Sequence, residues 1–176
     1  MYKHQKIIFG AAITFVIVLL VSFFIFNSGT TELKHPAFGV SLEYPDNWLP
    51  NPDGAAFENV PLYYSGSDGF FGIDAVAAPP EASFGDVINS LILGKQRTTY
   101  GSEPSISSTT IAGMDARLVL PSDDQPEEAK NEAALVVKYP KPLKIRDNLY
   151  TFFMIYGDAK HIEKIGRTLE FIGFAE

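Results

Sequence analysis

The chain has 176 residues and a net charge of −7, with 21 acidic side chains against 14 basic ones. Lys3 and Lys6 precede a long apolar run, and taking these two from the 14 leaves 12 basic residues against 21 acidic ones, a net charge of −9, for the rest of the chain. A surface this acidic repels phosphate backbones, which excludes nucleic acid as the expected partner. The absence of cysteine excludes disulfides, thiolate metal sites, cysteine nucleophiles and a lipid anchor on a cysteine.

The apolar run, Ile7–Phe26, contains no charged residue. As a helix it would extend for about 30 Å, the thickness of the hydrocarbon core of a bilayer, and it predicts one transmembrane anchor. Lys3 and Lys6 before it keep the amino terminus in the cytoplasm by the positive-inside rule, so the rest of the chain is expected outside the cytoplasm, at the surface of a cell membrane. A cleaved secretory signal is the alternative, although its apolar region is usually shorter, about 7 to 15 residues.

These observations divide the chain into four parts. Residues 1–6 are expected to be a cytoplasmic tail, 7–26 the anchor, 27–35 a short linker, and 36–174 a folded extracytoplasmic domain. Because the chain is 46% hydrophobic and 13% aromatic, the domain can bury a core of ordinary size.

The expected domain opens with the sequence "FGVSLEYPDNW". Apolar residues at every second position from Phe38 to Tyr44 predict a strand with one apolar face. Pro45 and the Asp-Asn pair after it predict a turn that ends the strand. Trp48 is expected to close one end of the core, with its indole N–H near the surface.

A hairpin and a helix are predicted next. Segments 61–65 and 70–78 flank the sequence "GSDG", which is typical of a hairpin connection. Asp74, in the second arm, is expected to face solvent, because one face of an antiparallel sheet is often wet. Apolar residues then recur at helical spacing, and Ser83 with Asp86 resembles a capping box at the start of that helix.

The second half of the domain predicts further strands. Segment 105–120 is expected to be two strands joined by a turn at Gly113, and segment 121–131 a solvated acidic loop. Strands are predicted at 133–139 and 149–156, and the second of these, apolar on both faces, is expected to be central and covered on both sides.

The end of the chain completes the predicted fold. The prolines of "YPKP" at 139–142 predict that the strand before them lies at a sheet edge. A short helix is expected from Asp158, and "LEFIGF" is expected to be extended. Because the strands come in hairpins rather than alternating singly with helices, the expected fold class is α+β, an antiparallel sheet with helices packed on it.

Three segments resemble a known family. "FGVSLEYPDNW", "TTIAGMDARLV" and "HIEKIGRTLEFI" resemble the opening strand, the central strand and turn, and the closing helix and strand of the Mog1/PsbP-like superfamily. The resemblance implies an antiparallel sheet sandwiched between helices, and a non-catalytic role, since members act by docking on larger assemblies. Tyr44, Pro45, Trp48 and Gly113 match as structural positions of the core and turns, and none of them matches as a catalytic residue. The anchor departs from the cleaved transit peptide of plant members.

One group of side chains is a candidate metal site. Asp123, Asp124, Glu127 and Glu128 place four carboxylates within six positions, and calcium prefers several oxygen ligands. The spacing is not that of an EF-hand, and a solvated acidic loop is the alternative. No other cofactor is expected.

The signals for catalysis are few. His161 is the only plausible general base outside the tail and linker, and at the start of the last helix it is expected to face solvent; a hydrolase is therefore the third hypothesis. The first hypothesis is a non-catalytic, membrane-tethered accessory or binding module that docks on a protein or an envelope component. The second is a pocket that carries or senses a metal or a small ligand.

Overall fold

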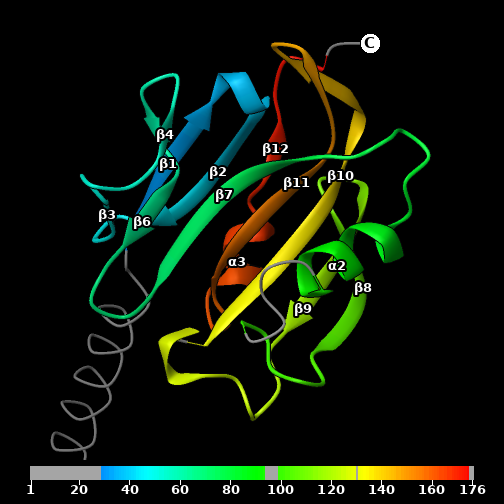
Figure 1. Cartoon of the computed structure of the whole chain (residues 1–176). Helices are drawn as coiled ribbons and strands as arrows, with labels where there is room; N and C mark the ends of the chain where they lie inside the picture. The colour runs from blue at the N-terminus through cyan, green and yellow to red at the C-terminus, as the bar shows by residue number, and fades with distance from the viewer. Residues whose placement is uncertain (1–28, 94–98, 130, 175–176) are drawn as a thin grey trace, which may run out of the picture. The chain divides into compact units, whose positions relative to one another are not determined.

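The structure is a computed structural model that describes residues 29–93, 99–129 and 131–174 (Figure 1). The fold below belongs to the compact unit Thr31–Glu176. The predicted tail at 1–6 and the predicted anchor at Ile7–Phe26 lie outside the described residues. Across those three ranges, no helix is both long enough and apolar enough to cross a bilayer.

A seven-stranded sheet forms the centre of the unit, and every neighbouring pair of its strands is antiparallel. In spatial order the strands are β3 (Leu49–Pro50), β6 (Tyr63–Ser65), β7 (Phe70–Ala77), β11 (Asn148–Asp158), β10 (Glu132–Ile145), β9 (Met114–Leu120) and β8 (Ser105–Ile111).

Smaller elements cover this main sheet. A three-stranded sheet has the order β1, β2, β12, and a separate hairpin consists of β4 and β5. The bounds are β1 (Thr30–His35), β2 (Val40–Pro45), β12 (Glu170–Phe171), β4 (Ala56–Phe57), β5 (Val60–Pro61), the α-helices α2 (Phe84–Leu93) and α3 (Ile162–Gly166), and the 3₁₀ helices η1 (Pro36–Phe38) and η2 (Glu127–Ala129).

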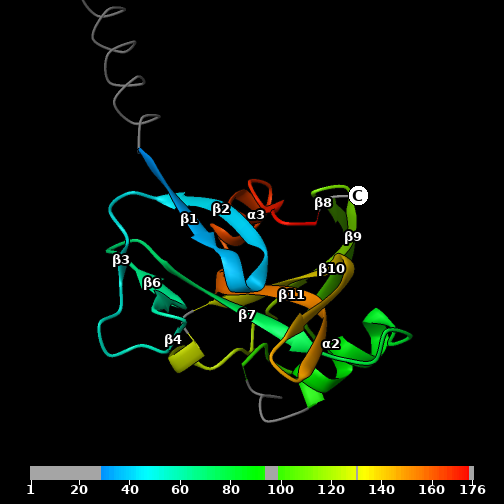
Figure 2. The ribbon, with the colours of Figure 1, turned by 90° about the horizontal axis from the view of Figure 1, so that it is seen from above.

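The two faces of the main sheet belong to two different cores. In β11, Phe153 and Ile155 point into the larger core under the three-stranded sheet and α3, while Phe152 and Met154 point into a second core under α2. Figure 2 shows the main sheet between α2 on one side and β1, β2 and α3 on the other. This alternation follows from the two-residue period of a strand. The predictions of an antiparallel α+β fold and of a central strand at 149–156, covered on both sides, are confirmed.

The cover of the larger core differs from the predicted pair of helix layers. A three-stranded sheet and the five-residue helix α3 provide it. Part of this cover comes from Thr30–His35, which is strand β1 of the three-stranded sheet. The predicted linker at 27–35 is therefore wrong from Thr30 onward. Leu33 and His35 are buried and alternate with exposed neighbours, a strand pattern too short and too polar to stand out in the sequence.

Two strand predictions need correction at prolines. Phe38 is buried, but it ends the 3₁₀ helix η1, which begins at Pro36, and Gly39 in the left-handed conformation (φ 64°) separates it from β2. The predicted edge strand before "YPKP" is also wrong, since β10 lies between β9 and β11. Pairing with β9 ends at Val137, and the register with β11 shifts between Lys138 and Leu143, so the prolines fall at an irregularity where the ladder is already interrupted.

Local turn and cap signals are confirmed. Ala112 and Gly113 form a two-residue turn with positive φ at both positions, which places Ile111 opposite Met114. At the start of α2, the amide of Ser83 donates to Asp86, and the amide of Asp86 donates to the Ser83 hydroxyl, as a capping box requires.

Candidate functional site

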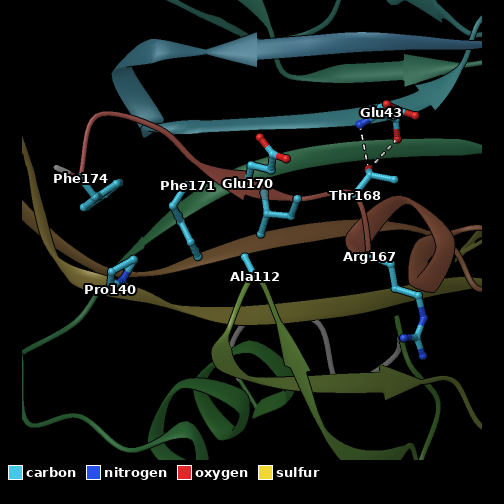
Figure 3. A pocket seen from close by; sticks show the side chains of 9 residues that line it. Glu43, Ala112, Pro140, Arg167, Thr168, Glu170, Phe171 and Phe174 are labelled. Atoms are coloured by element: carbon cyan, nitrogen blue, oxygen red, sulfur yellow. Dashed lines mark hydrogen bonds between the residues drawn. The ribbon is translucent and has the colours of Figure 1, made fainter. Parts of the chain in front are cut away.

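A groove of about 720 Å³ opens beside β12 and the β8–β9 turn. In Figure 3, Phe171, Phe174 and Pro140 gather at one end of it, while Arg167 and Thr168 lie at the other. The groove is thus apolar at one end and polar at the other. Its full lining is Glu43, Ala112, Pro140, Arg167, Thr168, Leu169, Glu170, Phe171 and Phe174.

The segment after α3 holds the polar end in place. The Thr168 hydroxyl accepts a hydrogen bond from the amide of Glu43 (2.8 Å) and lies 2.7 Å from the carbonyl oxygen of Ile165. It therefore joins the end of α3 to β2 (Figure 3). β12 then pairs antiparallel with β2, Glu170 opposite Ser41. In the part of the chain that the structure describes, no strand pairs with the other edge of β12, which borders the groove.

Aromatic rings hold the apolar end in place. Phe171 and Phe174 meet edge to face with ring centroids 5.8 Å apart, and Tyr139 contacts both rings. The Tyr139 hydroxyl donates to the carbonyl oxygen of Phe38 (2.9 Å), and burial raises its pKa. Because the Tyr139 ring is fixed at both ends, it supports the two phenylalanines from inside the core.

The rim of the groove is acidic on balance. Glu43 and Glu170 are exposed, and so is Arg167, whose guanidinium pairs with Glu163 one turn earlier in α3. The single positive charge of the rim is thus partly neutralised by a carboxylate outside it, while the two glutamates add negative charge to a chain that is already acidic.

A second, smaller concavity of about 430 Å³ lies beside the "GSDG" loop. The indole N–H of Trp48 donates to Asp68 (2.8 Å), and this hydrogen bond is the main reason that the pKa of Asp68 is lowered. His161 lies against the Trp48 ring at 5.1 Å, with Nδ1 3.3 Å from Asp158 and Nε2 3.8 Å from Asp68. The concavity is lined by Asn51, Tyr63, Ser65, Gly66, Asp68, Gly69, Phe70 and Asp158.

His161 is therefore not the solvent-facing side chain that the sequence predicts. Its side chain is only 16% exposed, because Trp48 covers the ring and two carboxylates face its nitrogens. Asp158, at the end of β11, is only three positions before His161, whereas Asp68 comes from the β6–β7 connection and approaches His161 only in the folded chain, without a local sequence signal. This arrangement orients an imidazole between two acids.

The four structural residues of the resemblance lie in the core and the turns. Tyr44 is buried against Tyr64 and Phe71, and Trp48 is 1% exposed. Pro45 ends β2, and its carbonyl oxygen accepts from the amide of Trp48 (3.0 Å). Gly113 lies in the β8–β9 turn.

The acidic loop does not bring its four carboxylates together. Asp124 accepts hydrogen bonds from the Ser122 hydroxyl and from the amide of Ser102 (3.0 Å), and these hydrogen bonds lower its pKa to about 2. Glu127 and Glu128 lie in η2. Within ranges 29–93, 99–129 and 131–174, no three His, Asp or Glu side chains converge as a metal site. Calcium at Asp123, Asp124, Glu127 and Glu128 stays a prediction.

Asp74 is exposed on the α2 face of β7, as predicted. Its carboxylate accepts from the amide of Ala75 (2.8 Å). Neighbouring side chains nevertheless remove enough water from the carboxylate to raise its pKa. It lies outside both concavities.

Comparison with known proteins identifies no family. No family model matches the chain, and no curated protein matches it. Among solved structures, the solution structure of cyanobacterial PsbP (CyanoP) from Synechocystis sp. PCC 6803 is similar with a TM-score of 0.44 and 11% identity, over 82% of this chain and 93% of that chain. A TM-score below 0.5 gives this similarity no weight for family, ligand or partner.

None of the residues that line the larger groove is among the site residues that the sequence predicts. Its lining comes from β2, the β8–β9 turn, β10 and the segment after α3, which are far apart in the chain. Because the lining is assembled only in the folded chain, the sequence holds no local signal for the groove.

Proposed function

We propose that this protein is an accessory module that docks on a protein partner through the groove beside β12. The observation that carries the proposal is the composition of the groove, which combines an aromatic end with a charged rim in one concavity of about 720 Å³. Protein interfaces have the same anatomy, a buried apolar centre rich in aromatic residues with a polar rim around it.

The groove favours a partner segment that is extended and basic. The outer edge of β12 borders the groove, and because β12 has only two residues, an extended segment can add only a short main-chain pairing there to the contacts that its side chains make with the groove. Glu43 and Glu170 on the rim, together with the net negative charge, favour positive charge on the partner. An apolar side chain of the same segment would occupy the end near Phe171 and Phe174.

The predicted anchor supports a location of docking outside the cytoplasm. If Ile7–Phe26 anchors the chain, the groove is held outside the cytoplasm within a short distance of the membrane surface. The partner is then a membrane protein or an envelope protein that reaches that surface.

Site-specific photo-crosslinking in membranes of the native host tests the proposal. A photoreactive phenylalanine analogue replaces Phe174, inside the groove, and in a second full-length variant it replaces Leu149, which is 40% exposed and outside the groove. We expect a discrete crosslinked protein from position 174 that is absent from position 149. The same products from both positions, or no product from position 174, would contradict docking through this groove.

A charge reversal tests the chemistry of the partner. Glu170→Lys, on the rim, and Glu81→Lys, exposed and outside the groove, change the net charge equally. We expect Glu170→Lys to lower the yield of the position-174 crosslink by roughly three- to tenfold, and Glu81→Lys to leave it near the parental value. Equal losses in both variants would indicate a response to net charge alone and would remove the rim from the proposal.

A further inference from the structure

Strand β8, Ser105–Ile111, ends the main sheet on one side (Figure 1). Its sequence, "SISSTTI", contains no charged residue and no proline. Five of its seven residues are exposed, including Ile106 at 49%. One edge of β8 pairs with β9, and along the other edge no strand lies among the residues that the structure describes.

The turn after β8 determines which backbone groups face the open edge. In a two-residue hairpin the flanking pair, Ile111 and Met114, is hydrogen-bonded, and hydrogen-bonded pairs then alternate along an antiparallel ladder. Ile111, Thr109 and Ser107 therefore direct their amides and carbonyls to β9. Ile106, Ser108 and Thr110 direct theirs outward.

Natural sheets usually protect such an edge with charge, proline or short length. The opposite edge of this sheet has that protection, since β3 has only two residues, Leu49 and Pro50, and one of them is proline. β8 has seven residues and none of these features. A long, neutral, exposed edge is suited to main-chain pairing with another strand.

We propose that β8 pairs antiparallel with β8 of a second copy of this chain, about a two-fold axis at Ser108, so that the two seven-stranded sheets become continuous. Ser108 then lies opposite Ser108 of the second copy, and Ile106 lies opposite Thr110. The inference goes beyond docking at the groove, because none of the β8 residues lines the groove.

Geometry selects this register. Directly opposed residues point their side chains to the same face, and side chains alternate between faces along each strand. If corresponding faces of the two sheets are to lie on the same side, the residue numbers of each opposing pair must therefore add to an even total. Centring on Ser108 pairs all three outward-facing residues and makes about six hydrogen bonds. A centre at Ser107 would place Thr110 opposite Pro104, which has no amide hydrogen, and a centre at Thr109 would place Ile106 opposite Ala112, which lies in the turn.

The composition of β8 favours a second copy over an unrelated strand. In this register Ser and Thr side chains oppose one another, and such pairs are favourable across strands. Ile106, exposed in one copy, gains the methyl group of Thr110 of the other as an apolar neighbour. Both copies are strongly acidic, yet no charged residue of β8 faces a like charge across the contact. Because the contact is one strand long, association should be weak and concentration-dependent.

Single-cysteine variants of the full chain test the register, since the chain has no native cysteine. Opposing residues of a hydrogen-bonded pair have Cα atoms about 5.5 Å apart, which a disulfide can join, whereas diagonal neighbours, about 7 to 8 Å apart, are too distant. We expect Ser108→Cys to form disulfide-linked dimers under mild oxidation. Ser107→Cys should form disulfide-linked dimers with a yield at least about fivefold lower, because the two Ser107 residues are diagonal neighbours in this register.

Two further variants control for collision and for direction. Ser90→Cys, exposed on α2, measures random encounter. A mixture of Ser107→Cys and Thr109→Cys chains should form mixed dimers, because these two positions face each other in the register. If Ser108→Cys crosslinks no better than Ser90→Cys, or if Ser107→Cys crosslinks as well as Ser108→Cys, the proposal is overturned.

Charge pairs provide a second measurement that does not depend on oxidation. Ser108→Lys and Ser108→Glu each place two like charges opposite one another, so each variant alone should remain monomeric by light scattering at concentrations where the parent chain associates. Their equimolar mixture should associate again. A parent chain that stays monomeric throughout, or a mixture that does not associate, would overturn the proposal. The crosslink from position 174 is measured separately and stands or falls independently.

Discussion

His35 shows how a polar side chain can belong to the core without a signal in the sequence. It is 0% exposed, its Nδ1 accepts from the amide of Phe38 (3.2 Å), and its ring stacks on the Phe38 ring at 4.0 Å. Its Nε2 is buried with no hydrogen-bond partner in the part of the chain that the structure describes. Burial lowers the pKa of this histidine, and Glu58 opposes that change only in part.

The lowered pKa predicts a loss of stability in mild acid. The folded state binds a proton at His35 less readily than the unfolded state, whose histidine pKa is about 6.5. The stability contributed by neutral His35 is therefore complete above about pH 6.5 and is lost as the pH falls through the folded pKa. Urea unfolding between about pH 8 and pH 5 should show the midpoint falling.

The matched variants for this prediction are His35→Asn and His161→Asn. Asn at position 35 keeps an acceptor for the Phe38 amide and removes the titration, so its midpoint should be lower at every pH but vary less below about pH 6.5. His161→Asn leaves His35 in place, so its urea midpoint should still fall in mild acid as the parental midpoint does. An unchanged slope in His35→Asn would show that another group causes the acid response.

Glycines beside Trp48 have a steric role that the sequence alone does not reveal. A Cβ atom at Gly66 would lie 2.2 Å from Cδ1 of the Trp48 ring, and one at Gly69 would lie 2.8 Å from the same ring. The "GSDG" motif predicts a hairpin connection and forms one, and the Trp48 ring packed against it explains why both ends of the motif are glycine.

Alanine substitutions at two glycines should therefore change stability in opposite directions. Gly66→Ala is expected to lower the free energy of unfolding by about 1 to 3 kcal/mol, because Trp48 or the loop must move. Gly85→Ala, inside α2 where the nearest atom is 3.4 Å away, should raise it by about 0.5 to 1 kcal/mol through helix propensity. Thermal or urea unfolding measures both, and equal effects would contradict the packing argument.

At the scale of elements, signals local in sequence predicted the structure well. Three features could be predicted because each depends on only a few neighbouring residues: the apolar strand at 149–156, the capping box at Ser83 and the turn at Gly113. The groove could not be predicted from the sequence, because its polar end depends on a hydrogen bond between Thr168 and Glu43, which are 125 positions apart. Strand β1 was not predicted for a related reason: its polar sequence forms a strand only because it pairs with β2, and that pairing has no local signal.

The Thr168 hydroxyl should be measurable as the link between α3 and β2. Thr168→Val keeps the shape but leaves the amide of Glu43 without this acceptor, so it should lower the free energy of unfolding by about 1 kcal/mol. Hydrogen exchange at the Glu43 amide should accelerate. Thr168→Ser keeps the hydroxyl and should keep the protection of that amide, and loss of protection in both variants would show that the hydroxyl alone does not account for it.

At the scale of the whole molecule, the two proposed contacts differ in the charges that they bring together. The groove is proposed to receive a basic segment, whereas β8 is proposed to meet a second copy that is equally acidic. Salt screens both interactions, with a Debye length of about 10 Å at 0.1 M. Screening weakens attraction between opposite charges and also weakens repulsion between like ones.

Salt should therefore change the two contacts in opposite directions. Between about 50 mM and 500 mM NaCl, we expect the crosslink from position 174 to a basic partner to decrease severalfold. The disulfide yield of Ser108→Cys should increase over the same range, because the strand pair itself contains no ionic contact and only the long-range repulsion of two acidic copies opposes it. Ser90→Cys corrects the disulfide yield for any change in random encounter. A crosslink at 174 that is insensitive to salt would indicate an apolar partner, and a disulfide yield that falls with salt would require an attraction between charged groups that the proposed β8 register does not contain.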